Sequence, residues 1–309
     1  MGFSRPQAIS FAAMTALVLV SPAVLYPVFL MKVLCFALFA CAFNLLIGYV
    51  GLVSFGHAAY FGMGSYVSAY VAKTWGFSPE LSILAGTLSG AALGTAFGWL
   101  AIRRQGSYFA MITLALAQMN YFFCVEAPFT GGENGIEPVP RGNLFGLLSL
   151  QPDMTMYWLV AFVFLFGFLL IHRVVHSPFG QVLKAIRENE PRAISLGYRV
   201  DDYKLVAFIL STALAGAAGG TKALVFGIAT LTDVDFQMSG EVVLMTLLGG
   251  LGTIFGPVMG ALVVTTMENY LAQFGGWVTV TQGVIFVACV IAFRRGIIGE
   301  LAGRLRMAL

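Results

Sequence analysis

The sequence predicts an all-α, polytopic membrane protein with about ten transmembrane helices, forming a single transmembrane domain over residues 1–309. Hydrophobic residues make up 59% of the chain and charged residues only 10%, whereas a soluble domain usually carries about 25% charged residues. The apolar residues stand in long continuous runs without the alternation of a barrel strand, so helices must satisfy the backbone in lipid. The 36 glycines suit helices that pack closely inside a membrane.

Ten apolar runs cover most of the chain, and each is interpreted as one membrane span of about 20 residues. They lie at residues 8–30, 33–50, 55–72, 81–102, 107–125, 156–173, 204–226, 240–252, 256–273 and 277–293. The run from Ala8 to Leu30 is long for the apolar core of a signal peptide and lacks a small-residue cleavage site. It is therefore the first predicted span.

The distribution of lysine and arginine predicts that both termini are cytoplasmic, because positive charge collects in cytoplasmic loops. This orientation leaves Lys32, Lys73 and Arg141 outside, with Lys222 near the outer end of a span. The remaining basic residues fall inside: Arg5, Arg103, Arg104, Arg173, Lys184, Arg187, Arg192, Arg199, Lys204, Arg294, Arg295, Arg304 and Arg306. Two connections are long, an outer loop at about 126–155 and a cytoplasmic segment at about 177–203.

Residue patterns for catalysis or for metal binding are missing from the sequence. The four cysteines form no Cys-x-x-Cys pair, and His172 and His176 have the i, i+4 spacing of metal ligands but no third ligand nearby. The chain has no G-x-x-x-x-G-K-[ST] phosphate loop, no G-x-S-x-G elbow and no H-E-x-x-H motif. We expect no catalytic residue, no cofactor, no metal and no nucleic-acid partner, with membrane lipid as the surroundings.

Glycine and polar residues gather at membrane depth in the stretch from Asn44 to Tyr66. Polar groups there need partners or water, and broken helices at such points often bind a transported solute. The alternative is a hydrogen-bonded hairpin that only locks two spans together. The candidate residues for a translocation path are Asn44, Gly48, Ser54, His57 and Asn120.

Two further glycine patterns concern packing and symmetry. Gly86, Gly90, Gly94 and Gly98 recur every fourth residue, which predicts a smooth helix face for close packing. The glycines and Phe at 48–56 are repeated at 249–256, which is either a trace of internal duplication or a chance recurrence.

The cytoplasmic segment contains start and stop signals for a short helix. Pro191 suits the first helical position and Gly197 suits the position just after the helix. A short helix of about two turns, exposed and surrounded by charge, can pass a push from a docked partner to the membrane spans. The candidate coupling residues are Arg187, Glu188, Asn189, Glu190, Pro191, Arg192, Ala193 and Gly197.

At this point the chain resembles the LivM/LivH-type permeases of branched-chain amino acid ABC importers, and the LivM type in particular. The resemblance lies in separate motifs in the same order: Asn44 through Tyr66, Tyr108 through Ala115, Thr130-Gly131-Gly132, Ser177 through Tyr203, and Ser239 through Pro257. In the coupling loop of this family, the matching positions are Glu190, Arg192, Ala193 and Gly197. Glu190 and Gly197 are seven residues apart, one more than in the family pattern.

The resemblance implies an ABC importer permease fold in the bacterial or archaeal cytoplasmic (inner) membrane. It implies a homologous LivH-like permease, two cytoplasmic ABC ATPase subunits and a periplasmic or extracellular substrate-binding protein as partners. Relatives of this type carry leucine, isoleucine and valine, but also other amino acids, amides or urea.

Two other functions, a secondary transporter or channel and a membrane-embedded enzyme, make different demands on the sequence. A self-contained secondary transporter or channel for a small polar solute needs ionisable residues inside the spans. The sequence places only Lys222 and Glu268 there, and Lys222 is expected either to extend to the surface or to pair with Glu268. A membrane-embedded enzyme needs a nucleophile–base pair or a ligand cluster, which the sequence does not offer.

Overall fold

The computed structural model describes residues 5–23, 25–104, 106–146, 148–271 and 296–305, together with residues 280, 281, 283, 284, 286, 287 and 291. The predicted last span at 277–293 falls largely outside the described residues, as do Cys289, Arg294, Arg295 and Arg306.

The described chain is mostly helical, as the composition predicts. Its first part consists of α1 (Arg5–Val20), the turn η1 (Ser21–Ala23), α2 (Pro27–Tyr49), α3 (His57–Thr74), α4 (Pro79–Ala101) and α5 (Ser107–Glu126). Its second part consists of η2 (Pro128–Thr130), η3 (Gly132–Asn134), β1 (Asn143–Leu144), β2 (Leu148–Ser149), α6 (Asp153–Val175), α7 (Pro178–Glu188), α8 (Glu190–Ser195), α9 (Val200–Phe226), η4 (Leu231–Asp233), α10 (Phe236–Gly249), α11 (Gly256–Leu271) and α13 (Gly296–Leu305).

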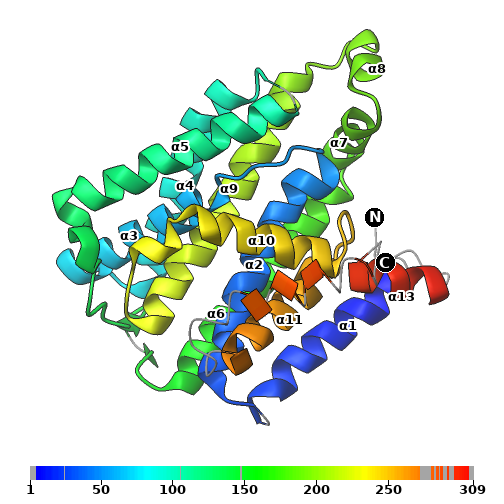
Figure 1. Cartoon of the computed structure of the whole chain (residues 1–309). Coiled ribbons are helices and arrows are strands. Elements are labelled where there is room, and N and C mark those ends of the chain that lie inside the picture. Colours follow the sequence, from blue (N-terminus) through cyan, green and yellow to red (C-terminus); the bar gives the residue numbers. More distant parts are fainter. Residues whose placement is uncertain are drawn as a thin grey trace.

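Helix α2 forms the centre of the bundle (Figure 1). It is buried at nearly every position from Leu30 to Tyr49, and it packs against α6, α9, α10 and α11. Helix α9 packs in turn against α3 and α4. A helix that is apolar all round, with no polar face, is what a central position requires.

Helices α3, α4 and α9 meet through their backbones. A Cβ atom on Gly90 would lie 2.5 Å from the carbonyl oxygen of Thr212, and one on Gly216 would lie 2.5 Å from that of Gly86. The predicted packing role of the glycine strip on α4 is therefore confirmed, because Gly94 and Gly98 also face α9. Small residues allow this approach where lipid gives no hydrophobic driving force between helices.

Five described helices are long and apolar enough to cross a membrane: α2, α4, α5, α6 and α9. The prediction of a helical protein with several membrane spans is thus confirmed, and the number of ten spans stays a prediction. Helices α10 and α11 have 14 and 16 residues. At 1.5 Å per residue they rise about 21 and 24 Å, less than the hydrocarbon core of about 30 Å.

The predicted single span over 8–30 is wrong. Helix α1 ends at Val20, and α2 begins at Pro27 after the turn η1. Proline has no backbone N–H to continue a helix, and Pro22 lies within the break while Pro27 ends it. Pro27 is instead well placed to open the second helix, because the first helical N–H groups need no partner inside the helix.

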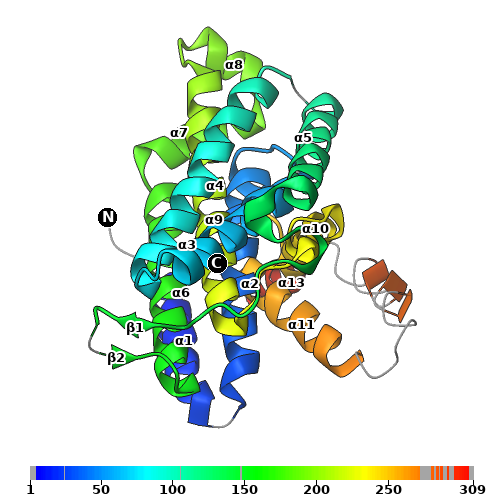
Figure 2. The same cartoon turned by 90° about the vertical axis from the view of Figure 1, so that its left-hand side faces the viewer.

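The end of the bundle opposite α8 carries the loop between α5 and α6 with its β1–β2 hairpin (Figure 2). The two strands are antiparallel, with Asn143 opposite Ser149. This loop is joined to the α9–α10 connection, since the Ile136 amide donates to the Ala229 carbonyl at 3.0 Å and the Val139 amide to the Gly227 carbonyl at 2.8 Å. The two connections therefore form one continuous surface.

Lys222 pairs with Asp233, and not with Glu268, which was one of the two alternatives for this lysine. Lys222 Nζ lies 2.8 Å from both carboxylate oxygens of Asp233, whose side chain is only 2% exposed. The turn η4 follows α9 closely and brings Asp233 back to the helix, where Ser65 Oγ also donates to it at 3.2 Å. Glu268 pairs instead with Lys32, at 3.2 Å.

Candidate coupling and permeation site

The segment at about 177–203, for which a cytoplasmic position was predicted, forms two helices, α7 and α8, at one end of the bundle (Figure 1). Sequence reasoning predicted only the second. Helix α7 starts at Pro178, and the Ser177 hydroxyl accepts a hydrogen bond from the Gly180 amide at 3.3 Å. A serine cap before a proline is a recognisable start signal, so this helix could have been found from the sequence.

Helix α8 has the short length that was predicted, one position earlier than expected. Asn189 Oδ1 accepts from the Arg192 amide at 3.1 Å, so Glu190 is the first helical residue and Pro191 the second. At the other end Gly197 has a φ of +89°. Its amide bonds the Ile194 carbonyl at 2.9 Å, and the following Tyr198 amide bonds the Ala193 carbonyl at 3.2 Å, which is a Schellman ending.

One side of α8 is fixed to the rest of the chain. Ala193 is buried in a small cluster with Ile186 of α7 and Val200 of α9. Glu190 Oε1 accepts from Lys204 Nζ at 2.6 Å, and the Lys204 side chain is only 3% exposed. This ion pair joins the first turn of α8 to α9, and sequence reasoning missed it because the partners stand in different helices.

The rest of α8 and the residues of its ending are exposed, and they include apolar as well as polar side chains. Ile194 is 57% exposed, Leu196 69% and Tyr198 41%. The sequence-based hypothesis assigned partner contact to the charged residues around the helix, of which Glu188 and Arg192 are indeed exposed. The structure adds three large apolar side chains to that surface, which the analysis of charge had not considered.

Arg187 differs from the other charged residues of the segment, because it turns back toward the membrane helices. Its guanidinium donates a short hydrogen bond to the carbonyl of Gly48, in the last turn of α2. Arg187, a residue predicted for ATPase coupling, is thus in direct contact with Gly48, a residue predicted for the translocation path.

The two similar glycine hairpins, 48–56 and 249–256, lie against each other. Asn44 Nδ2 donates to the Thr253 carbonyl at 2.8 Å, and Asn44 Oδ1 accepts from the Gly252 amide at 3.0 Å. Gly48 leaves room for this contact, since a Cβ atom there would lie 2.8 Å from the Gly252 nitrogen. Asn44 is 2% exposed and therefore works as a buried joint between the hairpins.

Ser54 and His57 are also buried and have partners within the protein. Ser54 Oγ accepts from the Gly56 amide at 3.3 Å. His57 Nε2 lies 2.8 Å from Ser211 Oγ, which itself donates to the Ala42 carbonyl at 2.6 Å, so the ring nitrogen is the donor.

Asn120 is 3% exposed and makes a weaker contact than Asn44. Its Nδ2 lies 3.5 Å from the carbonyl of Ala59, the third residue of α3. A hydrogen bond of this length is at the limit of useful geometry. Asn120 therefore contributes less to the shape of the hairpin than Asn44 does.

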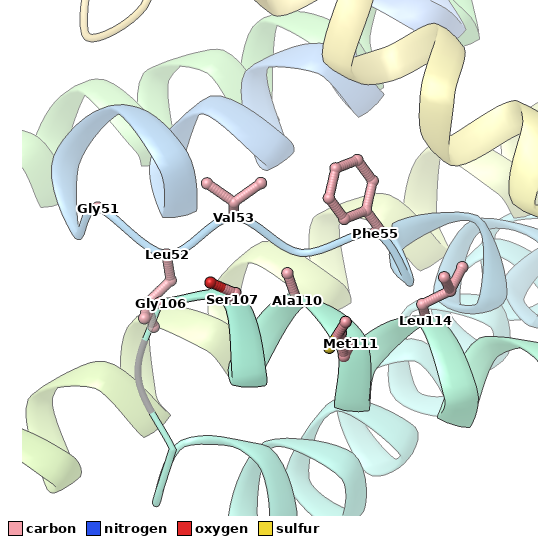
Figure 3. A pocket seen from close by; sticks show the side chains of 9 residues that line it. All are labelled: Gly51, Leu52, Val53, Phe55, Gly106, Ser107, Ala110, Met111 and Leu114. Atoms are coloured by element: carbon pink, nitrogen blue, oxygen red, sulfur yellow. The ribbon is translucent and has the colours of Figure 1, made fainter.

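A cavity of about 560 Å³ lies between the first hairpin and the start of α5 (Figure 3). Figure 3 shows Leu52, Val53 and Phe55 along the extended segment of the hairpin, which runs beside Ala110 and Met111 of α5. In this view the Leu52 side chain points toward the start of α5, and those of Val53 and Phe55 point away from it. None of the five predicted path residues lines it. Their hydrogen bonds go to residues outside its lining, and the lining itself is mostly apolar.

The described part of the chain contains no group of three or more His, Cys, Asp and Glu residues that could hold a metal. The rings of His172 and His176 are stacked with centroids 4.2 Å apart. Cys35, Cys41 and Cys124 are buried free thiols.

Comparison with known proteins places the matches along almost the whole chain. The family described as the permease component of branched-chain amino acid transport systems matches residues 27–293. The high-affinity branched-chain amino acid transport system permease protein LivM of Escherichia coli is 25% identical over 287 residues, covering 85% of this chain and 68% of LivM. LivH of Salmonella typhimurium, a permease protein of such a system, is 23% identical over 86% of this chain and 91% of LivH. No solved structure matches the chain significantly.

Proposed function

This chain belongs to the family of permease components of branched-chain amino acid transport systems, and we propose that it forms a translocation path together with a second, homologous permease. It is a multi-pass membrane protein and a transport component rather than a catalytic subunit. In the proposed complex, two cytoplasmic ATPases supply the energy and an external binding protein delivers the substrate. The similarity to both LivM and LivH supports a pair of related permeases.

The observation that carries this proposal is the two-sided character of α8. Its inner side is held by Ala193 and by the Glu190–Lys204 ion pair, so the helix is rigidly connected to α9. Its outer side presents Ile194, Leu196 and Tyr198 to the surroundings. Exposed apolar side chains on a rigid element are typical of a surface that enters a partner groove.

The proposed substrate is a branched-chain amino acid or a related small amino acid or amide. The apolar wall of the 560 Å³ cavity supports this, since it suits an aliphatic side chain and its volume is in the range of small-molecule sites. Weak, mostly apolar contacts also suit a path that must release what it admits. Calorimetry of the external binding protein with leucine, isoleucine, valine and other amino acids would identify the ligand delivered.

The docking role is tested by copurification. Burial of a large apolar side chain contributes about 1.5–3 kcal/mol, so replacing both Ile194 and Leu196 by serine should weaken ATPase binding at least about tenfold. The matched control is Leu148→Ser on the β1–β2 hairpin, where the leucine is 59% exposed at the opposite end of the bundle. The control complex should keep its ATPases.

ATPase recovery with the Ile194→Ser/Leu196→Ser variant equal to that with the Leu148→Ser control would contradict docking through α8. Solute uptake by the chain alone, without any ATPase, would instead favour a secondary transporter or channel. That function has less support here, because Lys222, an ionisable residue predicted within the spans, is held in an ion pair by Asp233.

A further inference from the structure

Arg187 belongs to the coupling segment, residues 177–203, and its side chain extends to the two glycine hairpins. It stands in the last turn of α7, and its guanidinium donates to the Gly48 carbonyl in the last turn of α2. The last carbonyls of a helix have no partner within the helix, and a cation near them is favourable. Lys184, one turn earlier on α7, lies with Nζ 5.8 Å from the centre of the Tyr49 ring. Two cations of α7 thus meet the same end of α2.

Arg187 also contacts the second hairpin. A Cβ atom on Gly51 would lie 3.1 Å from Arg187 Cγ, and one on Gly252 would lie 3.1 Å from Arg187 Nη1. Both glycines have positive φ, +83° and +74°, which other residues rarely adopt. The arginine therefore occupies a position that both hairpins leave open for it.

The contacts continue from Arg187 into the candidate path. The Gly48 carbonyl that accepts from Arg187 is one turn from Asn44, and Asn44 bonds both Gly252 and Thr253 of the second hairpin. The order of contact is α8, α7, Arg187, Gly48 and Gly252, then Asn44. These contacts join α7, the end of α2 and the connection between α10 and α11.

The coupling segment has a second attachment and room to move. The Glu190–Lys204 ion pair holds the start of α8 to α9. A cavity of about 200 Å³ lies beside these two attachments, lined by Gly51, Leu52, Gly106, Ile186, Arg187 and Lys204 among others. The segment therefore has open space next to its two fixed contacts.

We propose that Arg187 is the positioning residue through which the coupling segment controls the two glycine hairpins. Movement of α8 on an ATPase is passed by α7 and the Arg187 guanidinium to Gly48 and Gly252, and so to the wall of the candidate path. This inference rests on the proposed function and names the residue that connects ATP hydrolysis to passage of substrate. It differs from the sequence-based hypothesis, in which Arg187 is one of the charged residues around α8 that contact the ATPase.

The test uses the full complex, with both permeases, both ATPases and the binding protein, reconstituted in proteoliposomes. Three variants are compared: Arg187→Gln, which removes the charge, Arg187→Lys, which keeps it, and the control Arg173→Gln. Arg173 is an exposed cytoplasmic arginine in the last turn of α6, outside the coupling segment. ATPase content, ATP hydrolysis and substrate uptake are measured on the same preparations.

We expect Arg187→Gln to assemble and to hydrolyse ATP, while substrate taken up per ATP falls about tenfold, within the usual range of coupling between sites. Arg187→Lys should recover part of the uptake, and Arg173→Gln should behave as the wild type. Uptake per ATP equal to that of the control overturns the inference. So does a joint loss of assembly, hydrolysis and uptake in both Arg187 variants, which indicates a folding role. A wild-type complex that binds no ATPase contradicts instead the proposed function itself.

Discussion

At the scale of single residues, Asn44 makes the most specific contact in the candidate path. Replacing it by leucine leaves the Gly252 amide and the Thr253 carbonyl without their partner, and each unpaired buried group costs about 1–3 kcal/mol. We expect Asn44→Leu to lower uptake about tenfold at equal amounts of assembled complex. Asn120→Leu breaks only a 3.5 Å contact and should have a smaller effect.

Initial rates of uptake, normalised to purified complex, measure this difference between Asn44 and Asn120. Wild-type uptake by an assembled Asn44→Leu complex would reduce Asn44 to a packing residue. That was the alternative which the polar residues of the sequence left open.

The ion pair between Lys222 and Asp233 gives a second prediction at this scale. Because Asp233 is 2% exposed, Lys222→Met leaves a buried charge without compensation. The loss of one partner of a buried pair costs about 3–5 kcal/mol, whereas removal of both partners costs much less. We expect Lys222→Met to lower the melting temperature of the purified chain more than the double variant Lys222→Met/Asp233→Asn. An equal or smaller drop in the single variant would show that the pair contributes little.

At the scale of elements, the ending of α8 should matter more than backbone strain in general. Gly197 has a φ of +89°, and a side chain in the left-handed region costs roughly 1–2 kcal/mol. Gly76, after α3, has a φ of +63° and, like Gly197, open space where a Cβ atom would stand. Gly76→Val is therefore a matched control with the same kind of strain outside the coupling segment.

We expect Gly197→Val to reduce substrate-stimulated ATP hydrolysis and uptake, and Gly76→Val to leave both near wild type. The reason is that strain at Gly197 opens the turn that sets the position of Leu196 and Tyr198. Equal ATP hydrolysis and uptake in the two valine variants would show that the ending of α8 has no role in coupling.

The elements also show which features a single sequence can predict. The boundaries of α8 depend on hydrogen bonds within the segment from Asn189 to Tyr198, so nearby residues predict it locally. The Ser177–Pro178 start of α7 is equally local and was overlooked. The contact of Arg187 with Gly48 joins helices far apart in the chain, and that of Lys204 with Glu190 joins two successive helices. A single sequence contains no signal for such pairings, which is also why Asp233 was not among the alternatives considered for Lys222.

At the scale of the whole molecule, the predicted orientation places the two ends of the bundle on opposite sides of the membrane. Asn143 in β1 and Gln181 in α7 are both exposed, and the 23 residues of α6 separate their two segments. A helix of this length rises about 34 Å, enough to cross a bilayer. The cysteine of the Asn143→Cys variant should react with an impermeant maleimide from outside. The cysteine of the Gln181→Cys variant should react only after the membrane is permeabilised.

The background in this experiment is low at three native positions, because Cys35, Cys41 and Cys124 are buried. Labelling of both engineered cysteines from one side would exclude the predicted orientation. Hydropathy predicts the helical membrane class from composition alone, but it does not predict which helices are too short to cross by themselves. Length, tilt and burial of α10 and α11 depend on neighbours that the sequence does not identify.

The glycine contact among α3, α4 and α9 has a mechanical consequence. Where two backbones touch directly, as at Gly90 and Gly216, there are no intervening rotamers that could exchange one arrangement for another. Such a joint has nothing to repack, so the three helices should turn and shift as one body. Amide protons along this seam should exchange with the solvent at the same slow rate at each stage of the cycle. Deformation then concentrates where a side chain makes the contact, between Asn44 and the backbone of Gly252 and Thr253.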